Sequence, residues 1–432
     1  MKTYNYKDLS KADIQQLILR NSDSGNEIRE TVEDIIAAVK TNGDETLRAY
    51  ALKFDKVELK SLFIEREEIA ALANGISEEV KQAINTAYDN IKKFHETQVS
   101  KEAKVETTAG VTCWRETRAI EKVGLYIPGG SAVLPSTFLM LGIPAQIAGC
   151  KEIVVCSPPQ KSGSVNGYIA YVAQLLGVEK IYLAGGAQAV AAMAYGTESI
   201  PKVDKIFGPG NQFVTMAKTI IQSTTNTAID MPAGPSEVLV IADETANPVF
   251  VAADLLAQAE HGPDSQAVLV SSSQEIITNT LTELEKQINV LPRKEIAAKA
   301  IANSYTVLVD DLEEAMSFSN EYAPEHLILA TENWNTITDK IVNAGSVFLG
   351  NLTPESAGDY ASGTNHTLPT SAYARSYSGV SLDSFVKKIT FQHISESGIK
   401  NLGTTVEILA EIEGLHAHKN AVSVRLEKIK EE

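Results

Sequence analysis

The chain has 432 residues, and its 55 Asp and Glu against 38 Lys and Arg give a formal charge of −17 at pH 7. Hydrophobic residues make up 44% of it, which is enough for sizeable cores, so disorder is excluded as the main state. At about 150 residues per domain, the length predicts roughly two or three globular units. The acidic charge and the lack of a Lys and Arg stripe argue against nucleic acid and anionic membranes as partners.

Targeting and redox signals are weak. The first twenty residues mix charges and lack the apolar core of a signal peptide, and no stretch approaches the roughly 18 apolar residues of a membrane span. We therefore expect a cytoplasmic protein. Cys113, Cys150 and Cys156 are odd in number and have no CxxC spacing. This pattern predicts reduced thiols and neither a disulfide framework nor a thiolate metal site.

The N-terminal part is predicted to be largely helical, because apolar residues recur at helical spacing from about Glu27 to His95. Short runs of β-branched residues between Lys104 and Tyr126, around a turn at Gly110, then predict a small antiparallel excursion.

Beyond this point short apolar runs alternate with helical segments such as 168–176 and 250–260. The predicted strands are 153–156, 181–184, 238–242, 267–270, 306–309 and 347–349. Near-continuous apolar strands joined by helices are typical of an α/β protein in which helices cover both faces of a parallel sheet.

Pro and Gly clusters at 127–130 and 232–235 suggest that the chain passes between two α/β units there, so we expect an inserted domain. After Gly350 a polar stretch rich in Gly, Ser and Thr predicts a long functional loop. The tail is too short to bury a core alone and must dock on something. The predicted parts are an N-terminal helical arm at 1–24, a main α/β domain at 25–128 and 236–378, an inserted α/β domain at 129–235 and a tail at 379–432.

Six of the seven histidines lie after residue 260. Gln258 and His261 are three apart at the end of a predicted helix, so their side chains share a face and could hold an ion together. The alternative is that His261 only complements the negative end of the helix dipole, with Gly262 as the stop.

In the polar loop, Asp359 and His366 are separated by small residues that let both side chains reach one point; a solvated loop is the alternative. His416 and His418 would share a face if their segment is extended. Nitrogen from His261 and His418 with oxygen from Gln258 and Asp359 forms a mixed set that suits zinc or a similar divalent ion.

Glu325 and His326 follow Pro324 and precede the apolar run 327–329. Histidine is the natural proton acceptor near neutral pH, and a neighbouring carboxylate can activate water. Adjacent residues of a regular strand face apart, so a shared role needs an irregular backbone. The alternative is a surface Glu beside a His at a strand edge.

The chain has no GxGxxG fingerprint after a strand, which weakens the prediction of an ordinary dinucleotide fold. Gly-rich turns at 127–131, 185–186 and 208–211 could present backbone amides to a phosphate. Taken alone, each of them is better explained as a plain turn.

Taken together, a series of ordered motifs resembles the histidinol dehydrogenase family from about residue 120 to the end. These are IPGG at 127–130, GPGN at 208–211, DMPAGPSE at 230–237, QAEHG at 258–262, APEH at 323–326, GDYASGTNH at 358–366 and HKNAV at 418–422. The resemblance implies two Rossmann-like domains, the inserted one binding NAD. It also implies the last step of histidine synthesis, in which two NAD oxidise L-histidinol to L-histidine through histidinaldehyde.

The resemblance also implies roles for individual residues. Zinc, one ion per subunit, would be held by Gln258, His261, Asp359 and His418, and the acid and base pair would be Glu325 and His326. Ser236, His366 and Glu413 would contact the substrate together with Gln258, His261, His326, Asp359 and His418. Tyr126, Gln188 and Asn211 would contact NAD. The family implies a homodimer in which the tail completes the partner's site. His416 is not at a position that the family uses.

Three other functions stay open at this point. The chain could be an enzyme of the same family that oxidises a different small alcohol, although Asp359, His366 and Glu413 are all present. It could be a catalytically dead protein that binds zinc and nucleotide, although Glu325 and His326 are retained. It could also be a metal hydrolase in which Glu325 activates water.

Overall fold

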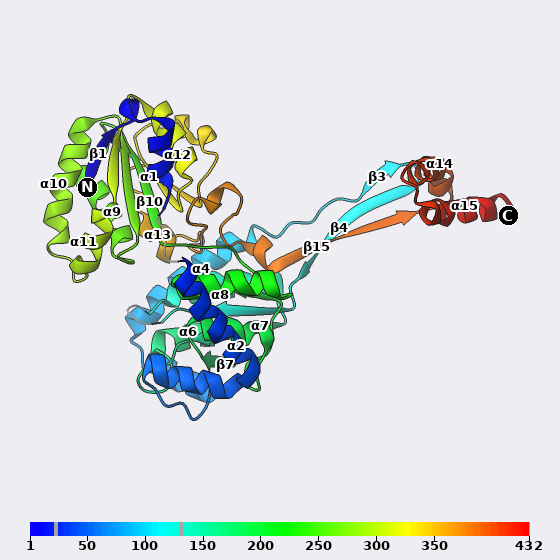
Figure 1. Ribbon diagram of the computed structural model, residues 1–432, viewed down its shortest axis with the longest axis horizontal. Helices are drawn as coiled ribbons and strands as arrows, with labels where there is room; N and C mark the ends of the chain where they lie inside the picture. The colour runs from blue at the N-terminus through cyan, green and yellow to red at the C-terminus, as the bar shows by residue number, and fades with distance from the viewer. Residues whose placement is uncertain (21–24, 130–132, 432) are drawn as a thin grey trace. The chain divides into compact units, whose positions relative to one another are not determined.

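The computed structural model describes residues 1–20, 25–129 and 133–431 (Figure 1). They form two compact units, the larger within residues 1–96 and 120–385 and the smaller within 97–119 and 386–432. Gly130 and Ser131 of the predicted Gly-rich turn at 127–131 lie outside the described residues.

The first sheet of the larger unit has six parallel strands in the order β1-β12-β11-β10-β13-β14. They are β1 (Lys2–Asn5), β10 (Glu237–Ala242), β11 (Gln266–Ser271), β12 (Tyr305–Leu308), β13 (His326–Ala330) and β14 (Ser346–Leu349). Successive residues of β10 face opposite sides: Val238 and Val240 belong to one core and Leu239 and Ile241 to another.

Helices cover both of these faces. The first core also contains residues of α9 (Pro248–Ala259), α10 (Gln274–Ile288) and α11 (Lys294–Ala302). The second contains residues of α1 (Lys11–Ile18) and α12 (Leu312–Tyr322). The prediction of an α/β protein with a parallel sheet buried on both faces is confirmed here.

The second sheet also has six strands, in the order β2-β7-β6-β5-β8-β9, all parallel except that β2 is antiparallel to β7. They are β2 (Phe63–Glu65), β5 (Lys122–Tyr126), β6 (Glu152–Ser157), β7 (Lys180–Leu183), β8 (Lys205–Phe207) and β9 (Ala228–Ile229). Its helices are α2 (Gly25–Tyr50), α3 (Arg66–Asn74), α4 (Glu78–Glu96), α5 (Pro135–Ala148), α6 (Gly167–Leu175), α7 (Gly186–Tyr195) and α8 (Gln212–Thr224).

The cores divide the chain differently from the predicted domain boundaries. Helix α2 packs against α7 and α8, α3 against α6 and α4 against α5, so residues 25–96 share a core with the predicted insert at 129–235; Ala361 of the predicted main domain packs against this core as well. The predicted arm at 1–24 adds β1 and α1 to the first sheet. The amphipathic pattern predicts that a helix buries one face, but it does not say which sheet covers that face.

The smaller unit joins the predicted excursion near 104–126 to the tail. Strands β3 (Val105–Thr108), β4 (Val111–Ala119) and β15 (Val386–Ile394) form an antiparallel sheet, and α14 (Glu396–Ile412) packs on α15 (His416–Glu431). The tail therefore begins later than the predicted residue 379 and includes an earlier segment. His416 and His418 lie on helix α15, so the extended conformation that would have placed both side chains on one face is not present.

Two composition-based predictions can be compared with the structure. Cys113, Cys150 and Cys156 are all free, as predicted, and burial raises the pKa of the Cys150 thiol to about 11. Within the described residues, none of the helices is long and apolar enough to cross a lipid bilayer.

Candidate active site

The first sheet brings Glu325 and His326 to the start of β13, directly beside the first residue of β10. Helix α12 ends at Tyr322, and Ala323 then adopts a left-handed backbone conformation (φ 52°) before the chain enters the strand. The backbone N–H of Glu237 donates to Glu325 Oε2 at 2.8 Å, and its carbonyl oxygen lies 3.2 Å from His326 Nδ1. Both side chains therefore converge on one peptide of β10, although they are adjacent in sequence.

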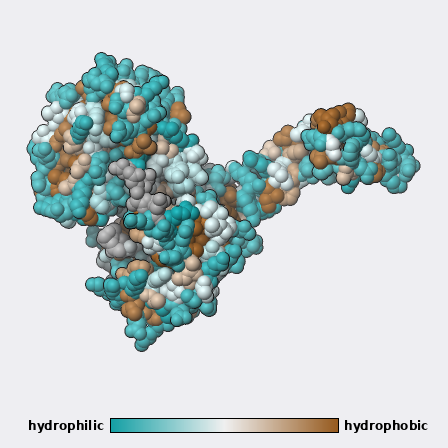
Figure 2. All heavy atoms as spheres, viewed as in Figure 1, coloured by the Kyte–Doolittle hydropathy of each residue, from teal (hydrophilic) through white to brown (hydrophobic). Residues whose placement is uncertain are grey.

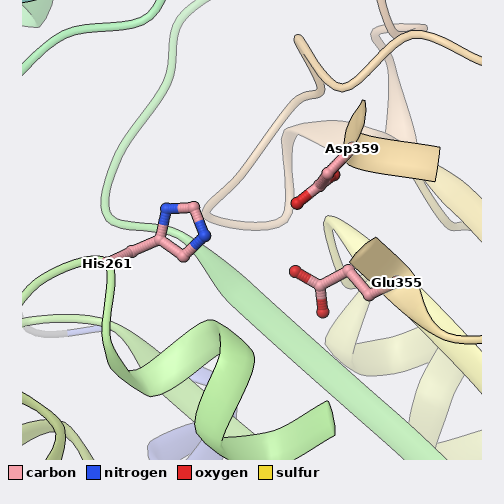
Figure 3. Close-up of side chains that lie close together, drawn as sticks. All are labelled: His261, Glu355 and Asp359. Atoms are coloured by element: carbon pink, nitrogen blue, oxygen red, sulfur yellow. The ribbon is translucent and has the colours of Figure 1, made fainter. Parts of the chain in front are cut away.

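The second group of side chains comes from the end of α9 and from α13 (Glu355–Tyr360). Ligand atoms of His261, Glu355 and Asp359 all lie within 4.8 Å of one another, and Figure 3 shows the three side chains pointing toward a common space. His261 follows α9, while Glu355 and Asp359 share one face of α13 because they are four residues apart. The predicted polar loop after Gly350 therefore contains a short helix.

His326 connects the two groups. Its Nε2 lies 3.4 Å from Asp359 Oδ1, and its Nδ1 lies 3.6 Å from Glu355 Oε1 and 3.7 Å from Glu325 Oε2. Among the described residues, His326 Nε2 and Glu355 Oε2 are buried and make no regular hydrogen bond. Buried polar atoms without partners are rare in folded proteins, and these two border the cluster.

Gln258 is fully buried beside this cluster. With its amide nitrogen toward Glu355 it donates to Glu355 Oε1, and its oxygen lies 2.7 Å from the Glu237 nitrogen, sharing that N–H with Glu325 Oε2. In the opposite orientation two oxygen acceptors face each other, which is the arrangement that a bound cation would stabilise. The mixed oxygen and imidazole set formed by Gln258, His261, Glu355 and Asp359 fits a divalent ion such as zinc.

Burial and excess negative charge shift the pKa values in the cluster. Burial raises the pKa of the Glu325 and Glu355 carboxyls to about 8 each. Burial disfavours the charged His326 imidazole, but the carboxylates of Glu355, Glu325 and Asp359 outweigh it and raise the His326 pKa well above its usual range. Burial also opposes ionisation of Asp359, yet the nearby His326 lowers the Asp359 pKa. The cluster holds more acidic groups than basic ones.

His366 is held by two neighbours. Its Nδ1 lies 2.8 Å from the carbonyl oxygen of Asp359 and its Nε2 lies 3.0 Å from the hydroxyl of Thr137, which belongs to α5. Because a carbonyl oxygen only accepts, Nδ1 carries the proton and Nε2 accepts from Thr137. Burial lowers the pKa of His366, which favours this neutral form. Asp359 and His366 do lie close together, as predicted, but His366 contacts the backbone carbonyl of Asp359 and not its side chain.

The structure gathers most of the predicted site residues, but not all of them. Gln258, His261, Glu325, His326 and Asp359 lie together, and Ser236 directly precedes β10. Glu413 and His418 belong to the smaller unit, where both are exposed at the end of α14 and on α15.

Sequence reasoning missed Glu355 and Glu237. Glu355 is four residues before Asp359, a spacing that would have been informative if α13 had been predicted. Glu237 gave no such signal, because its backbone N–H makes the contact and the partner, Glu325, is 88 positions away in the sequence.

The three predicted NAD contacts follow parallel strands of the second sheet at their carboxyl ends. Tyr126 ends β5, Asn211 caps α8 after β8, and Gln188 lies in the first turn of α7 after β7. The strand order reverses between β5 and β8, and ligands of open α/β sheets bind at such a point. The Tyr126 hydroxyl accepts from the Gly186 N–H at 3.2 Å, which joins two of these loops.

The loop before α8 is built closely against β5. Gly208 has a φ of 131°, and a Cβ there would lie 2.2 Å from the Tyr126 carbonyl oxygen. The Gly208 N–H donates to Asp230 at 2.9 Å and its carbonyl accepts from Lys218 at 2.9 Å, and these two side chains form a buried ion pair. This loop stands at the carboxyl edge of the second sheet, and the Phe213 and Val214 amides at the start of α8 donate to Asn211 Oδ1.

Comparisons with known proteins agree along the whole chain. A family model described as histidinol dehydrogenase matches residues 18–426. The histidinol dehydrogenases of Bacteroides thetaiotaomicron and Arabidopsis thaliana (chloroplastic) are 56% and 54% identical, over 100% and 99% of this chain and 100% and 92% of theirs. The crystal structure of histidinol dehydrogenase from Elizabethkingia anophelis is 55% identical, with a TM-score of 0.96 over 100% of this chain and 99% of that one. The chain therefore belongs to the histidinol dehydrogenase family.

Proposed function

We propose that the chain oxidises L-histidinol to L-histidine through histidinaldehyde, the last step of histidine synthesis, with zinc and two NAD. The observation that carries the proposal is the buried His326, whose Nε2 makes no regular hydrogen bond and lies 3.4 Å from Asp359 Oδ1, beside the cluster of His261 and Glu355. Family membership supplies the substrate, because the relatives are named for it. A cytoplasmic location stays a prediction from the sequence.

His326 is the proposed general base. An alcohol releases hydride only when its O–H proton is removed, so the imidazole takes this proton while NAD accepts the hydride. The same proton transfer recurs on the hydrated aldehyde in the second oxidation. The Glu237 carbonyl keeps the proton of a neutral imidazole on Nδ1, which leaves Nε2 as the accepting nitrogen.

Glu325 is the proposed base for water. Hydration of the aldehyde needs a group that removes a proton from the attacking water, and burial raises the pKa of this carboxyl to about 8, close to neutral pH. The hydrogen bond from the Glu237 N–H holds one oxygen of Glu325, so the other is available to water.

Gln258, His261 and Asp359 are the zinc ligands that we propose from this chain, with Glu355 as a further carboxylate in reach. Zinc would bind the imidazole and amine of histidinol, orient its reacting carbon and offset the negative charge around His326. Ser236 and His366 are the proposed substrate contacts from the larger unit. Glu413 is the third proposed contact and His418 the fourth zinc ligand, and both lie in the smaller unit.

We further propose a homodimer in which His418 and Glu413 complete the partner's site. Both residues are exposed. Helix α14 also exposes apolar side chains, with 57% of Ile408, 51% of Leu409 and 74% of Ile412 accessible. Figure 2 shows hydrophobic surface on the tail in the region of α14. Contiguous apolar patches of this kind mark interaction surfaces, and a second copy of the chain is the occupant that would place His418 at a site.

The first test is the reaction itself. The purified protein, supplied with zinc, NAD and L-histidinol, should form two NADH for each L-histidine produced. If no NADH appears under zinc-replete conditions, the proposed function is wrong.

The two catalytic roles should separate in variants. We expect His326→Asn to lower turnover of both histidinol and histidinaldehyde by about 10²-fold or more, because both oxidations need the base. Glu325→Gln should mainly slow the oxidation of histidinaldehyde, which needs water. Stopped-flow measurement of each half-reaction checks this. His393→Asn and Glu332→Gln, which change exposed residues elsewhere, are the matched controls. Normal aldehyde oxidation by Glu325→Gln would contradict the division of roles.

The NAD contact at Asn211 can be tested against a matched helix cap. Asn211 accepts from Phe213 N–H and Asn166 from Tyr168 N–H, so Asn211→Ala and Asn166→Ala should each cost about 1 kcal/mol of stability. Only Asn211→Ala should also raise the KM for NAD, by roughly 3- to 10-fold if one hydrogen bond is lost. Equal KM values for NAD in the two variants would remove Asn211 from the proposed site.

Shared sites predict complementation between inactive chains. His326→Asn and His418→Asn should each be inactive as homodimers. A refolded equal mixture should regain about a quarter of wild-type activity, because half of the dimers are hybrids and each hybrid has one intact site. Inactive mixtures with confirmed heterodimers would show that each site is formed by a single chain.

A further inference from the structure

Glu237 holds both members of the catalytic pair through its backbone alone. Its N–H donates to Glu325 Oε2 at 2.8 Å, and its carbonyl oxygen lies 3.2 Å from His326 Nδ1. A shift of this one peptide would move the carboxylate and turn the imidazole together. The position of Glu237 therefore sets the geometry on which both proposed proton transfers depend.

The side chain of Glu237 is itself fixed at both oxygens. Oε2 forms an ion pair with Arg20 Nη2 at 2.7 Å, and Oε1 accepts from the Ser371 N–H at 2.7 Å. Only 10% of the Arg20 side chain and 1% of the Glu237 side chain are accessible to solvent. Water cannot replace these contacts, so loss of either partner leaves a buried charge without its counter-charge.

Arg20 also holds the chain that leads into the catalytic pair. Its Nη1 donates to the carbonyl oxygen of Tyr322 at 3.0 Å, and its guanidinium lies 3.8 Å from the centre of the Tyr322 ring. Tyr322 is the last residue of α12, three positions before Glu325. One planar guanidinium thus joins the start of β10 to the segment that enters β13, a geometry that the single nitrogen of a lysine cannot reproduce in full.

The contribution of such a pair to overall stability is small. A buried ion pair loses most of its attraction to desolvation, and well-packed apolar side chains of similar volume are often equally stable. The specific result of this pair is geometric, because it fixes two backbone segments that carry catalytic groups. Neither Arg20 nor Glu237 was among the residues predicted from the sequence.

We propose that Arg20 and Glu237 are positioning residues for the reaction: their buried ion pair fixes the β10 peptide that holds Glu325 and His326. This inference rests on the proposed roles of Glu325 and His326. Arg20 lies outside the cluster of His261, Glu355 and Asp359, so it acts through Glu237 and not on the substrate.

The test compares Arg20→Met, Arg20→Lys and Glu237→Gln in the zinc-loaded full-length enzyme. We expect Arg20→Met to lower kcat on the order of 100-fold in both half-reactions, since a displacement of about 1 Å can have an effect of that size. The KM values for histidinol and NAD should stay within about threefold of wild type, because the pair touches neither ligand. Arg20→Lys and Glu237→Gln each keep one polar contact, so we expect their kcat to lie between that of Arg20→Met and that of the wild type.

Thr306→Val is the matched control. Thr306 Oγ1 bonds Thr3 Oγ1 at 2.9 Å and helps to attach the same N-terminal segment to the first sheet, but it does not contact Glu237. We expect this variant to lose thermal stability with kcat within about twofold of wild type.

Two results would overturn the proposal. One is a folded Arg20→Met or Glu237→Gln enzyme with kcat within about twofold of wild type. The other is a parallel fall of kcat and melting temperature in Arg20→Met and Thr306→Val alike, which would show a structural role only. Failure of the proposed function itself is distinguishable, because wild-type enzyme would then form no NADH or His326→Asn would turn over normally.

Discussion

Several acidic side chains surround the His326 imidazole, and the rest of the candidate site depends on this arrangement. Glu325 and Glu355 are almost fully buried, and with Asp359 they surround His326 within 3.7 Å. Buried carboxylates without enough positive charge must retain protons or gain a cation. The raised pKa values of Glu325 and Glu355 follow from their burial with too little positive charge nearby. A divalent ion beside His261 and Asp359 would relieve it, and this links the fold of the first sheet to the chemistry that we propose.

The candidate residues lie at opposite ends of the strands in the two sheets. In the first sheet the proposed catalytic pair stands at the start of β13, beside the start of β10, where Arg20 and Glu237 form a buried ion pair. In the second sheet the predicted NAD contacts follow the carboxyl ends of β5, β7 and β8, where the strand order reverses. We thus propose separate tasks for the two sheets: proton transfer by the acids and bases beside the first sheet, and nucleotide binding at the loop edge of the second.

Local patterns predicted local features well. The strands, the end of α9 with Gln258 and His261, and the paired Glu325 and His326 are all visible in the sequence because they depend on periodicity and spacing. Contacts between distant segments were not predictable. The amphipathic helices at 25–96 could pack on either sheet, Glu355 lay in a stretch that was predicted to be a loop, and Arg20 meets Glu237 across 217 positions. The shared face of His416 and His418 depended on an extended backbone, which the helix at 416–431 does not provide.

The most direct test of the central claim is a crystal structure of the zinc-loaded full-length protein, with anomalous scattering measured at the zinc edge. The account predicts one zinc peak per subunit at about 2.0 to 2.3 Å from His261 and Asp359, with His418 of the partner subunit as a further ligand. A zinc peak remote from the cluster of His261, Glu355 and Asp359 in a fully active preparation would contradict it.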